Sequence, residues 1–184
     1  MSRSWTDDTR RLFVACDLPH EAALAIGHWQ DSELSSRDGL RVTATVHLTL
    51  CFLGDVLAAR VPQVVDALGA VPFSRFELDV GDALFLPQRG AKRVVALEIV
   101  DDRGAVAALQ ADVSRALVER GLYKPEKRPF LPHLTVARYR RPGPPFPLQN
   151  VNVSRFGVDQ MVLYSSLLER AGAVHTPVTV FTAS

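Results

Sequence analysis

The sequence predicts an α+β fold with two lobes related by a pseudo-twofold duplication, in which antiparallel sheets line a central cleft and helices pack outside. Three observations lead to this prediction. Strand-like and helical runs follow the order strand, helix, strand, helix, strands, helix, strands, which is typical of α+β proteins with largely antiparallel sheets. The tripeptide His-Leu-Thr occurs twice, at residues 47–49 and 133–135, each time in a strand-like run. A helix and further strands accompany each copy, so we interpret the two halves as similar lobes facing one another.

The first half of the chain contains two predicted strands and two predicted helices. Residues 11–19 (RLFVACDLP) form a short apolar run that ends at a proline, and residues 20–36 carry apolar residues at helical spacing. Residues 41–54 are extended, and Gly54 with the following Asp marks a turn. Residues 56–70 are predicted to be helical, because one face collects Leu57, Val61, Val64, Val65 and Leu68.

The second half begins with two strand-like runs, 73–86 and 93–100. Residues 103–120 have the clearest helical stripe, and Gly121 suits the C-cap position. The proline-rich segment after Tyr139 (RRPGPPFP) is predicted to be a loop. Three final strands are expected near residues 151–156, 158–168 and 174–181.

Length and composition restrict the function classes. The 184 residues suit one domain, and 47% hydrophobic residues suffice for a substantial core. A formal net charge of +1 gives no global basic field, so contacts to a phosphate-bearing ligand must come from a local cluster. Cys16 and Cys51 lie in apolar runs, which is typical of buried, reduced thiols. Neither an apolar signal core nor a membrane-length run is present, so we expect a cytoplasmic monomer without a membrane association.

Each His-Leu-Thr copy has a polar face and an apolar face. Side chains alternate in a strand, so His47 and Thr49 point to one side while Leu48 points to the other, and the second copy repeats this pattern at His133 and Thr135. Two such strands across a groove would present two imidazoles and two hydroxyls to one ligand. A lone histidine in an apolar strand is more often structural, but the recurrence of the whole tripeptide favours a functional pair.

This set of groups fits in-line attack on phosphorus. One neutral imidazole removes a proton from water and one imidazolium protonates the leaving oxygen, because histidine titrates near pH ~6.5. The threonine hydroxyls can donate to the non-bridging oxygens. The scheme requires neither a cofactor nor a metal, and no zinc-type spacing is present, since His47 and Cys51 are poorly spaced for co-ligation. The remaining histidines, His20, His28 and His175, are predicted to be surface or helix-cap residues.

The segments around both copies resemble the 2H phosphoesterase superfamily, and within it the RNA 2′,3′-cyclic phosphodiesterases first described as 2′-5′ RNA ligases. The resemblance rests on RLFVACDLP, VHLTLCFLGDV, RPFLPHLTVAR and the C-terminal LYSSLLERAGAVHTPV, which span nearly the whole chain. It implies one domain over residues 1–184 made of two interleaved lobes, with the site in the cleft between them. It also implies hydrolysis of RNA or nucleotide 2′,3′-cyclic phosphate ends to 2′-phosphates, alongside the 2′-5′ ligation that family members can show.

The resemblance assigns unequal roles to the two copies. His47 would be the proton donor to the departing 3′ oxygen, His133 the proton acceptor that activates water, and Thr49 and Thr135 the groups that hold the phosphate. This direction comes from the family, since two equivalent motifs cannot decide it. The chain departs from the family at Cys51, where relatives often carry Lys and where we expect a groove-facing side chain.

Further substrate contacts are expected from an aromatic residue and from basic residues. Phe13 is a candidate for stacking on a base, and Arg93 opens a strand similar to one that lines the family's cleft. Arg128 precedes the second motif, and Arg138 would face away from His133 unless a bulge turns it to the rim. A local positive potential for an RNA backbone is expected from Lys124, Lys127, Arg128, Arg138, Arg140 and Arg141.

Two other functions remain open from the sequence. One is hydrolysis of small cyclic phosphates such as ADP-ribose 1″,2″-cyclic phosphate. The other is a non-catalytic nucleotide-binding module, which would have no need for both histidines and both threonines.

Overall fold

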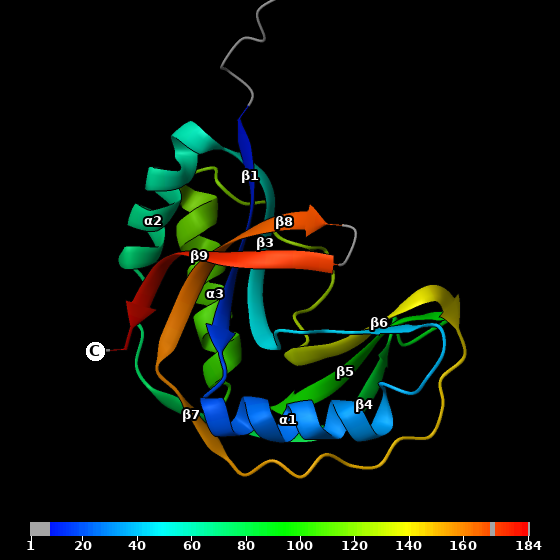
Figure 1. The fold of residues 1–184 in the computed structure, drawn as a ribbon. Coiled ribbons are helices and arrows are strands. Elements are labelled where there is room, and N and C mark those ends of the chain that lie inside the picture. The colour runs from blue at the N-terminus through cyan, green and yellow to red at the C-terminus, as the bar shows by residue number, and fades with distance from the viewer. Residues whose placement is uncertain (1–7, 170–171, 184) are drawn as a thin grey trace, which may run out of the picture.

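The computed structural model describes residues 8–169 and 172–183, and it confirms the predicted α+β class (Figure 1). Strands predominate, with three α-helices in the described part of the chain. In chain order the elements are β1 (Thr9–Asp17), α1 (His20–Glu33), β2 (Leu40–Val42), β3 (His47–Leu57), a 3₁₀ turn (Ala58–Arg60), α2 (Val61–Gly69), β4 (Phe76–Leu86), β5 (Lys92–Val100), α3 (Ala105–Glu119), β6 (His133–Gly143), β7 (Phe156–Val158), β8 (Gln160–Glu169) and β9 (Gly172–Thr182).

The strands form one curled antiparallel sheet whose order divides into two similar halves. The order is β7-β4-β5-β6-β3-β1-β8-β9, and β2 pairs with β6. We call β3, β1, β8 and β9 the β3 lobe, and β6, β5, β4, β7 and β2 the β6 lobe. The two His-Leu-Thr motifs begin β3 and β6, the strands at which the lobes meet. The predicted two-lobed duplication is therefore visible in the sheet order.

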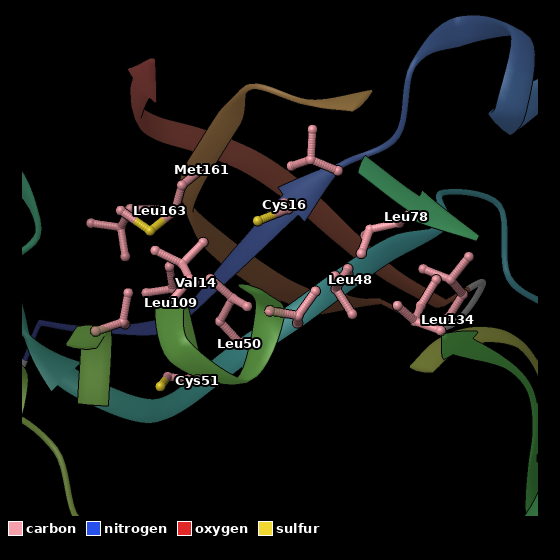
Figure 2. Close-up of a cluster of buried hydrophobic side chains, with 14 of the residues drawn as sticks. Val14, Cys16, Leu48, Leu50, Cys51, Leu78, Leu109, Leu134, Met161 and Leu163 are labelled. Atoms are coloured by element: carbon pink, nitrogen blue, oxygen red, sulfur yellow. The ribbon is translucent and has the colours of Figure 1, made fainter. Parts of the chain in front are cut away.

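The helices cover the outer faces of the lobes. The apolar stripe of α3 is buried, and α3 packs against β3 and α2. Figure 2 shows Leu109 of α3 near Val14 of β1 and Leu50 of β3. On the other lobe, α1 lies along the sheet (Figure 1), and the buried Gln30 donates from Nε2 to the backbone oxygen of Val136 in β6 at 2.8 Å. Within residues 8–169 and 172–183, no helix covers the opposite face of the sheet at the motif strands.

Four predicted boundaries were wrong, each because strand pairing overrode a local signal. Gly54 does not end its strand, since β3 continues to Leu57 and Gly54 adopts φ 73° at a register shift. The helix that follows consequently begins only at Val61. The proline-rich segment enters β6, which runs to Gly143 because Gly143 pairs with Lys92 of β5.

The fourth boundary concerns the strand predicted at 151–156. Only Phe156–Val158 forms a strand there, because these residues find a partner in β4 while the preceding residues pair with none. The C-cap of α3 is Arg120, one residue before the predicted Gly121, and Gly121 follows it in the left-handed conformation with φ 61° while its N–H donates to the backbone oxygen of Val118 at 2.9 Å.

Among residues 8–169 and 172–183, no helix combines the length and apolar character that crossing a membrane requires. The first residues, where the sequence predicts no signal core, lie largely outside the described range, as do residues 170–171 of the predicted C-terminal hairpin.

Candidate active site

The two motif strands meet at their central leucines. Leu48 of β3 pairs with Leu134 of β6 in antiparallel register, so His47 lies opposite Thr135 and Thr49 lies opposite His133. The leucines are 2% and 0% exposed, whereas both histidines and both threonines are half-buried on the other face. The structure therefore brings the four predicted motif side chains together on one face.

A matching irregularity follows each motif. Leu50 and Cys51 are both buried in β3, where its register against β1 shifts between Val14 and Ala15. A β-bulge adds one residue to a strand and reverses the alternation of side chains after it. As a result Phe52, five residues after His47, returns to the cleft face.

The same irregularity occurs in β6. Val136 and Ala137 are both buried, and the register against β5 shifts between Val95 and Ala96. Arg138, five residues after His133, consequently faces the cleft as well. The expectation that Arg138 would point away in a regular strand does not apply, because the strand is bulged.

The bulge overturns the prediction for Cys51. This side chain is 2% exposed and packs in the core, where Nε2 of Gln110 lies 3.7 Å from its sulfur. Burial raises the pKa of the thiol to about 11. Cys51 therefore does not share the groove with His47. Among the described residues, no group of three or more His, Cys, Asp or Glu is placed to hold a metal ion.

A cavity of about 390 Å³ lies on the motif face between the two lobes. His47, Thr49 and Thr135 line it, whereas His133 does not and lies beside it opposite Thr49. Its other walls are Arg11, Phe13, Arg41, Val42, Thr43, Ala44, Thr45, Phe52, Arg138, Ser166, Ala173 and His175. A larger cavity of about 630 Å³ near the start of α1 contains no motif side chain, so we place the candidate site in the smaller one.

The backbone fixes the tautomer of His133. Its Nδ1 lies 2.7 Å from the carbonyl oxygen of Leu131. A carbonyl only accepts hydrogen bonds, so Nδ1 carries the proton and Nε2 of the neutral ring keeps a free lone pair. Such a ring can accept a proton at Nε2 without changing its orientation.

His47 lies in an aromatic stack. Its ring centroid is 5.0 Å from that of Phe13 and 6.1 Å from that of Tyr164, and both contacts are stacked. Burial first, then the neighbouring His175 and Arg138, lower the pKa of His47 to about 4. The free site therefore holds His47 neutral at neutral pH.

A half-buried hydrogen bond anchors this stack. The hydroxyl of Tyr164 donates to both carboxylate oxygens of Asp17, at 2.9 and 2.8 Å. Asp17 in turn pairs with His47 in the register of β1 and β3. Phe13, the predicted base-stacking residue, lines the cavity but is only 2% exposed, so it packs against His47 rather than presenting a face to solvent.

The predicted basic contacts are divided between the cavity and the surface. Arg138 lines the cavity, and burial together with Arg41, its cross-strand partner in β2, lowers the pKa of Arg138. Arg93 is exposed in β5 and does not line the cavity. The side chain of Arg128 is 82% exposed, and its guanidinium lies 3.8 Å from a carboxylate oxygen of Glu126.

Sequence reasoning missed or misplaced several cavity residues with aromatic or basic side chains. Phe52 is 42% exposed, and the guanidinium of Arg11 lies 4.6 Å from its ring centroid. Arg41 reaches the cavity from β2. His175, predicted at the surface or a helix cap, instead lines the cavity from β9. Strand alternation could have predicted that Arg11 lines the cavity, because it lies two residues before Phe13 in β1. The position of Phe52 could not have been predicted in this way, because it depends on the bulge in β3.

Comparisons with known proteins agree with this geometry. The sequence model of a family described as the 2′-5′ RNA ligase superfamily matches residues 18–169. An Escherichia coli K12 protein named RNA 2′,3′-cyclic phosphodiesterase is 32% identical over 171 residues, which cover 92% of this chain and 94% of that protein. The crystal structure of E. coli LigT in apo form superposes with a TM-score of 0.83 at 25% identity, covering 97% of this chain and 99% of that one. LigT complexed with 3′-AMP gives a TM-score of 0.83 at 26% identity, covering 96% and 99%.

Proposed function

Because the chain belongs to the 2′-5′ RNA ligase superfamily, we propose that it hydrolyses 2′,3′-cyclic phosphate ends of RNA or nucleotides to 2′-phosphates by acid/base catalysis between His47 and His133. The observation that carries this proposal is the pairing of Leu48 with Leu134, which sets two imidazoles and two threonine hydroxyls on one face beside a cavity. The relatives' names supply the substrate class, and the site supplies the groups that such a reaction needs.

In the proposed reaction His133 acts as the base. Its Nε2 accepts a proton from water, while the Leu131 carbonyl holds the Nδ1 proton and stabilises the imidazolium that forms. The oxygen of that water forms a bond to phosphorus as the bond to the 3′ oxygen breaks. A 5′-hydroxyl in the place of this water would give a 2′-5′ linkage instead.

His47 acts as the acid and transfers its proton to the departing 3′ oxygen. A pKa of about 4 leaves it neutral in the free site, so the substrate itself must favour the charged form. A bound phosphodiester brings a negative charge next to the ring, and an opposite charge raises a histidine pKa. The acid would thus become protonated only when its substrate is present.

The remaining groups bind the phosphate. Thr49 and Thr135 lie opposite the two histidines and can donate to the non-bridging oxygens as charge develops on them. Arg138 faces the same cavity and attracts the anion over a longer range. Every proton in this scheme moves between water, substrate and imidazole, so we propose that the reaction is independent of metal ions.

Phosphorus NMR of the products tests this function. A nucleoside 2′,3′-cyclic phosphate should be converted to the 2′-phosphate in the presence of EDTA, with the double variant H47A/H133A as the control for contaminating nucleases. No conversion, or a 3′-phosphate product, would contradict the proposal, and activity that EDTA abolishes and one divalent metal restores would contradict metal independence. Parallel reactions with a short RNA bearing a cyclic end and with ADP-ribose 1″,2″-cyclic phosphate identify the preferred substrate class.

A further inference from the structure

A third histidine, His175 of β9, lies in the candidate active site. It lines the cavity, and its ring meets that of His47 edge-on, with centroids 5.4 Å apart and an interplanar angle of 83°. It also contacts Phe13 at 4.9 Å and 75°. His175 therefore adjoins the proposed acid, although neither motif contains it.

The two ring nitrogens of His175 have different surroundings. Nδ1 is fully buried and has no hydrogen-bond partner within residues 8–169 and 172–183. The cavity-facing polar atom of the ring is consequently Nε2. A buried N–H without an acceptor is rarer and more costly than a buried acceptor without a donor. The neutral ring therefore carries its proton on Nε2, with Nδ1 as the bare nitrogen.

The surroundings also keep this ring uncharged. Burial, and then the positive charge of Arg138, lower the pKa of His175. Protonation would place a second N–H at the buried Nδ1, where no acceptor is available in the described structure. It would also add a positive charge beside His47, Arg138 and the cavity-lining Arg11 and Arg41. A neutral N–H donor next to the acid is the state that these contacts favour.

We propose that His175 is a substrate-binding residue whose Nε2–H donates a hydrogen bond to a non-bridging oxygen of the bound cyclic phosphate. This inference rests on the proposed function, because it takes that phosphate as the ligand of the cavity. A neutral donor stabilises the phosphate charge without opposing the protonation of His47, which a third cation at this place would do. His175 thereby differs from the two motif histidines, because it moves no proton.

Three substitutions separate hydrogen bonding from ring packing. The amide N–H of glutamine in H175Q reaches a position near that of Nε2, whereas the shorter asparagine in H175N places its amide near Nδ1. H175F keeps an aromatic ring against Phe13 and His47 but has no donor. H28F, at an exposed histidine of α1, is the matched control for replacing a histidine by phenylalanine.

Steady-state kinetics on a nucleoside 2′,3′-cyclic phosphate provide the first readout. H175F and H175N should lower kcat/KM by about 10-fold or more, with most of the loss in KM, while H175Q should stay within about 3-fold of the wild type and H28F should match it. Thermal unfolding of each variant checks that the fold is intact. Wild-type kinetics in H175F, or a loss in H175Q as large as that in H175F, would overturn the proposal.

Nitrogen-15 NMR of the histidine rings in the full-length protein provides a readout that needs no turnover. His175 should show a protonated Nε2 and a bare Nδ1 across neutral pH, and inorganic phosphate should shift its Nε2 resonance. A proton on Nδ1 of His175 would overturn the proposal. So would a His175 Nε2 resonance that does not move when phosphate shifts the ring resonances of His47. If the wild type turns over no cyclic phosphate, the proposed function fails, but this spectrum still decides the state of His175.

Discussion

Leu48 of β3 pairs with Leu134 of β6, and this pair joins the two lobes of the sheet. In each lobe a bulge follows the motif and turns the fifth residue after the histidine to the cleft, Phe52 after His47 and Arg138 after His133. Arg138 is close enough to His47 to lower its pKa, and the ring of Phe52 stacks on that of Phe13, which in turn stacks on His47. A guanidinium and an aromatic stack that includes the 42% exposed Phe52 therefore both lie on the side of the proposed acid.

Loss of either motif imidazole should abolish efficient turnover. We expect H47A and H133A each to lower kcat by about 10²-fold or more on a nucleoside 2′,3′-cyclic phosphate, because each removes one proton-transfer group. H28A, at an exposed site on α1, is the matched control and should behave as the wild type. A wild-type rate in either motif variant, measured on folded protein, would rule out the two-histidine mechanism.

Phosphate binding should raise the pKa of His47. The free ring has a pKa of about 4, and a neighbouring anion favours the imidazolium. An NMR titration of the His47 ring with and without saturating inorganic phosphate measures the difference, with His28 as an internal reference on α1. A pKa of His47 that stays near its free value in the complex would argue against its role as the acid.

Removing the charge of Arg138 should change both the binding of the substrate and the pKa of His47. R138M should raise the pKa of His47, because it removes a cation that lowers it, and should raise KM for the anionic substrate. The salt dependence of KM should weaken in the same variant. R115M, which removes an exposed cation of α3 that lies 2.6 Å from Asp112, is the control for net charge. If R138M and R115M changed KM and the pKa of His47 equally, Arg138 would act only through the net charge of the protein.

His47 should make the protein less stable in acid. Its pKa falls from 6.5 in the unfolded chain to about 4 in the folded protein, so between these values the unfolded chain binds a proton that the folded one does not. Stability therefore falls as the pH drops through this window, by about 3 kcal/mol from this group alone.

Urea unfolding at neutral and acidic pH checks this effect. The wild type should lose more of its unfolding free energy between the two conditions than H47Q, whose side chain does not titrate. Carboxylates titrate equally in both proteins, so the difference between them reports on His47. Identical losses would show that the pKa of His47 is not lowered in the folded state.

Both thiols should be inert in the native protein. Cys16 is 0% exposed and Cys51 2% exposed, and burial raises their pKa values to about 12 and 11. A thiol-specific reagent at neutral pH should therefore react slowly until denaturant is added, and then with both residues. Fast labelling of Cys51 in the folded protein would show that its side chain faces the cleft, and this would contradict the bulge in β3.

The amino-acid sequence by itself determined the faces of the two motif strands and the general architecture. The repeated His-Leu-Thr predicted two His/Thr faces backed by buried leucines, because alternation in a strand is a local property of the backbone. The apolar stripe of residues 103–120 likewise predicted α3, and Gly121 its end.

Only the tertiary structure decided what surrounds these faces. The bulges at Leu50 and Val136 arise from pairing with β1 and β5, which no local pattern reveals, and they bury Cys51 while turning Arg138 to the cleft. His175 reaches the cavity because β9 pairs with β8 and β8 with β1, contacts between residues far apart in the chain. Local spacing fixes which side of its own strand a residue faces, but long-range pairing decides where that strand lies and where its alternation reverses.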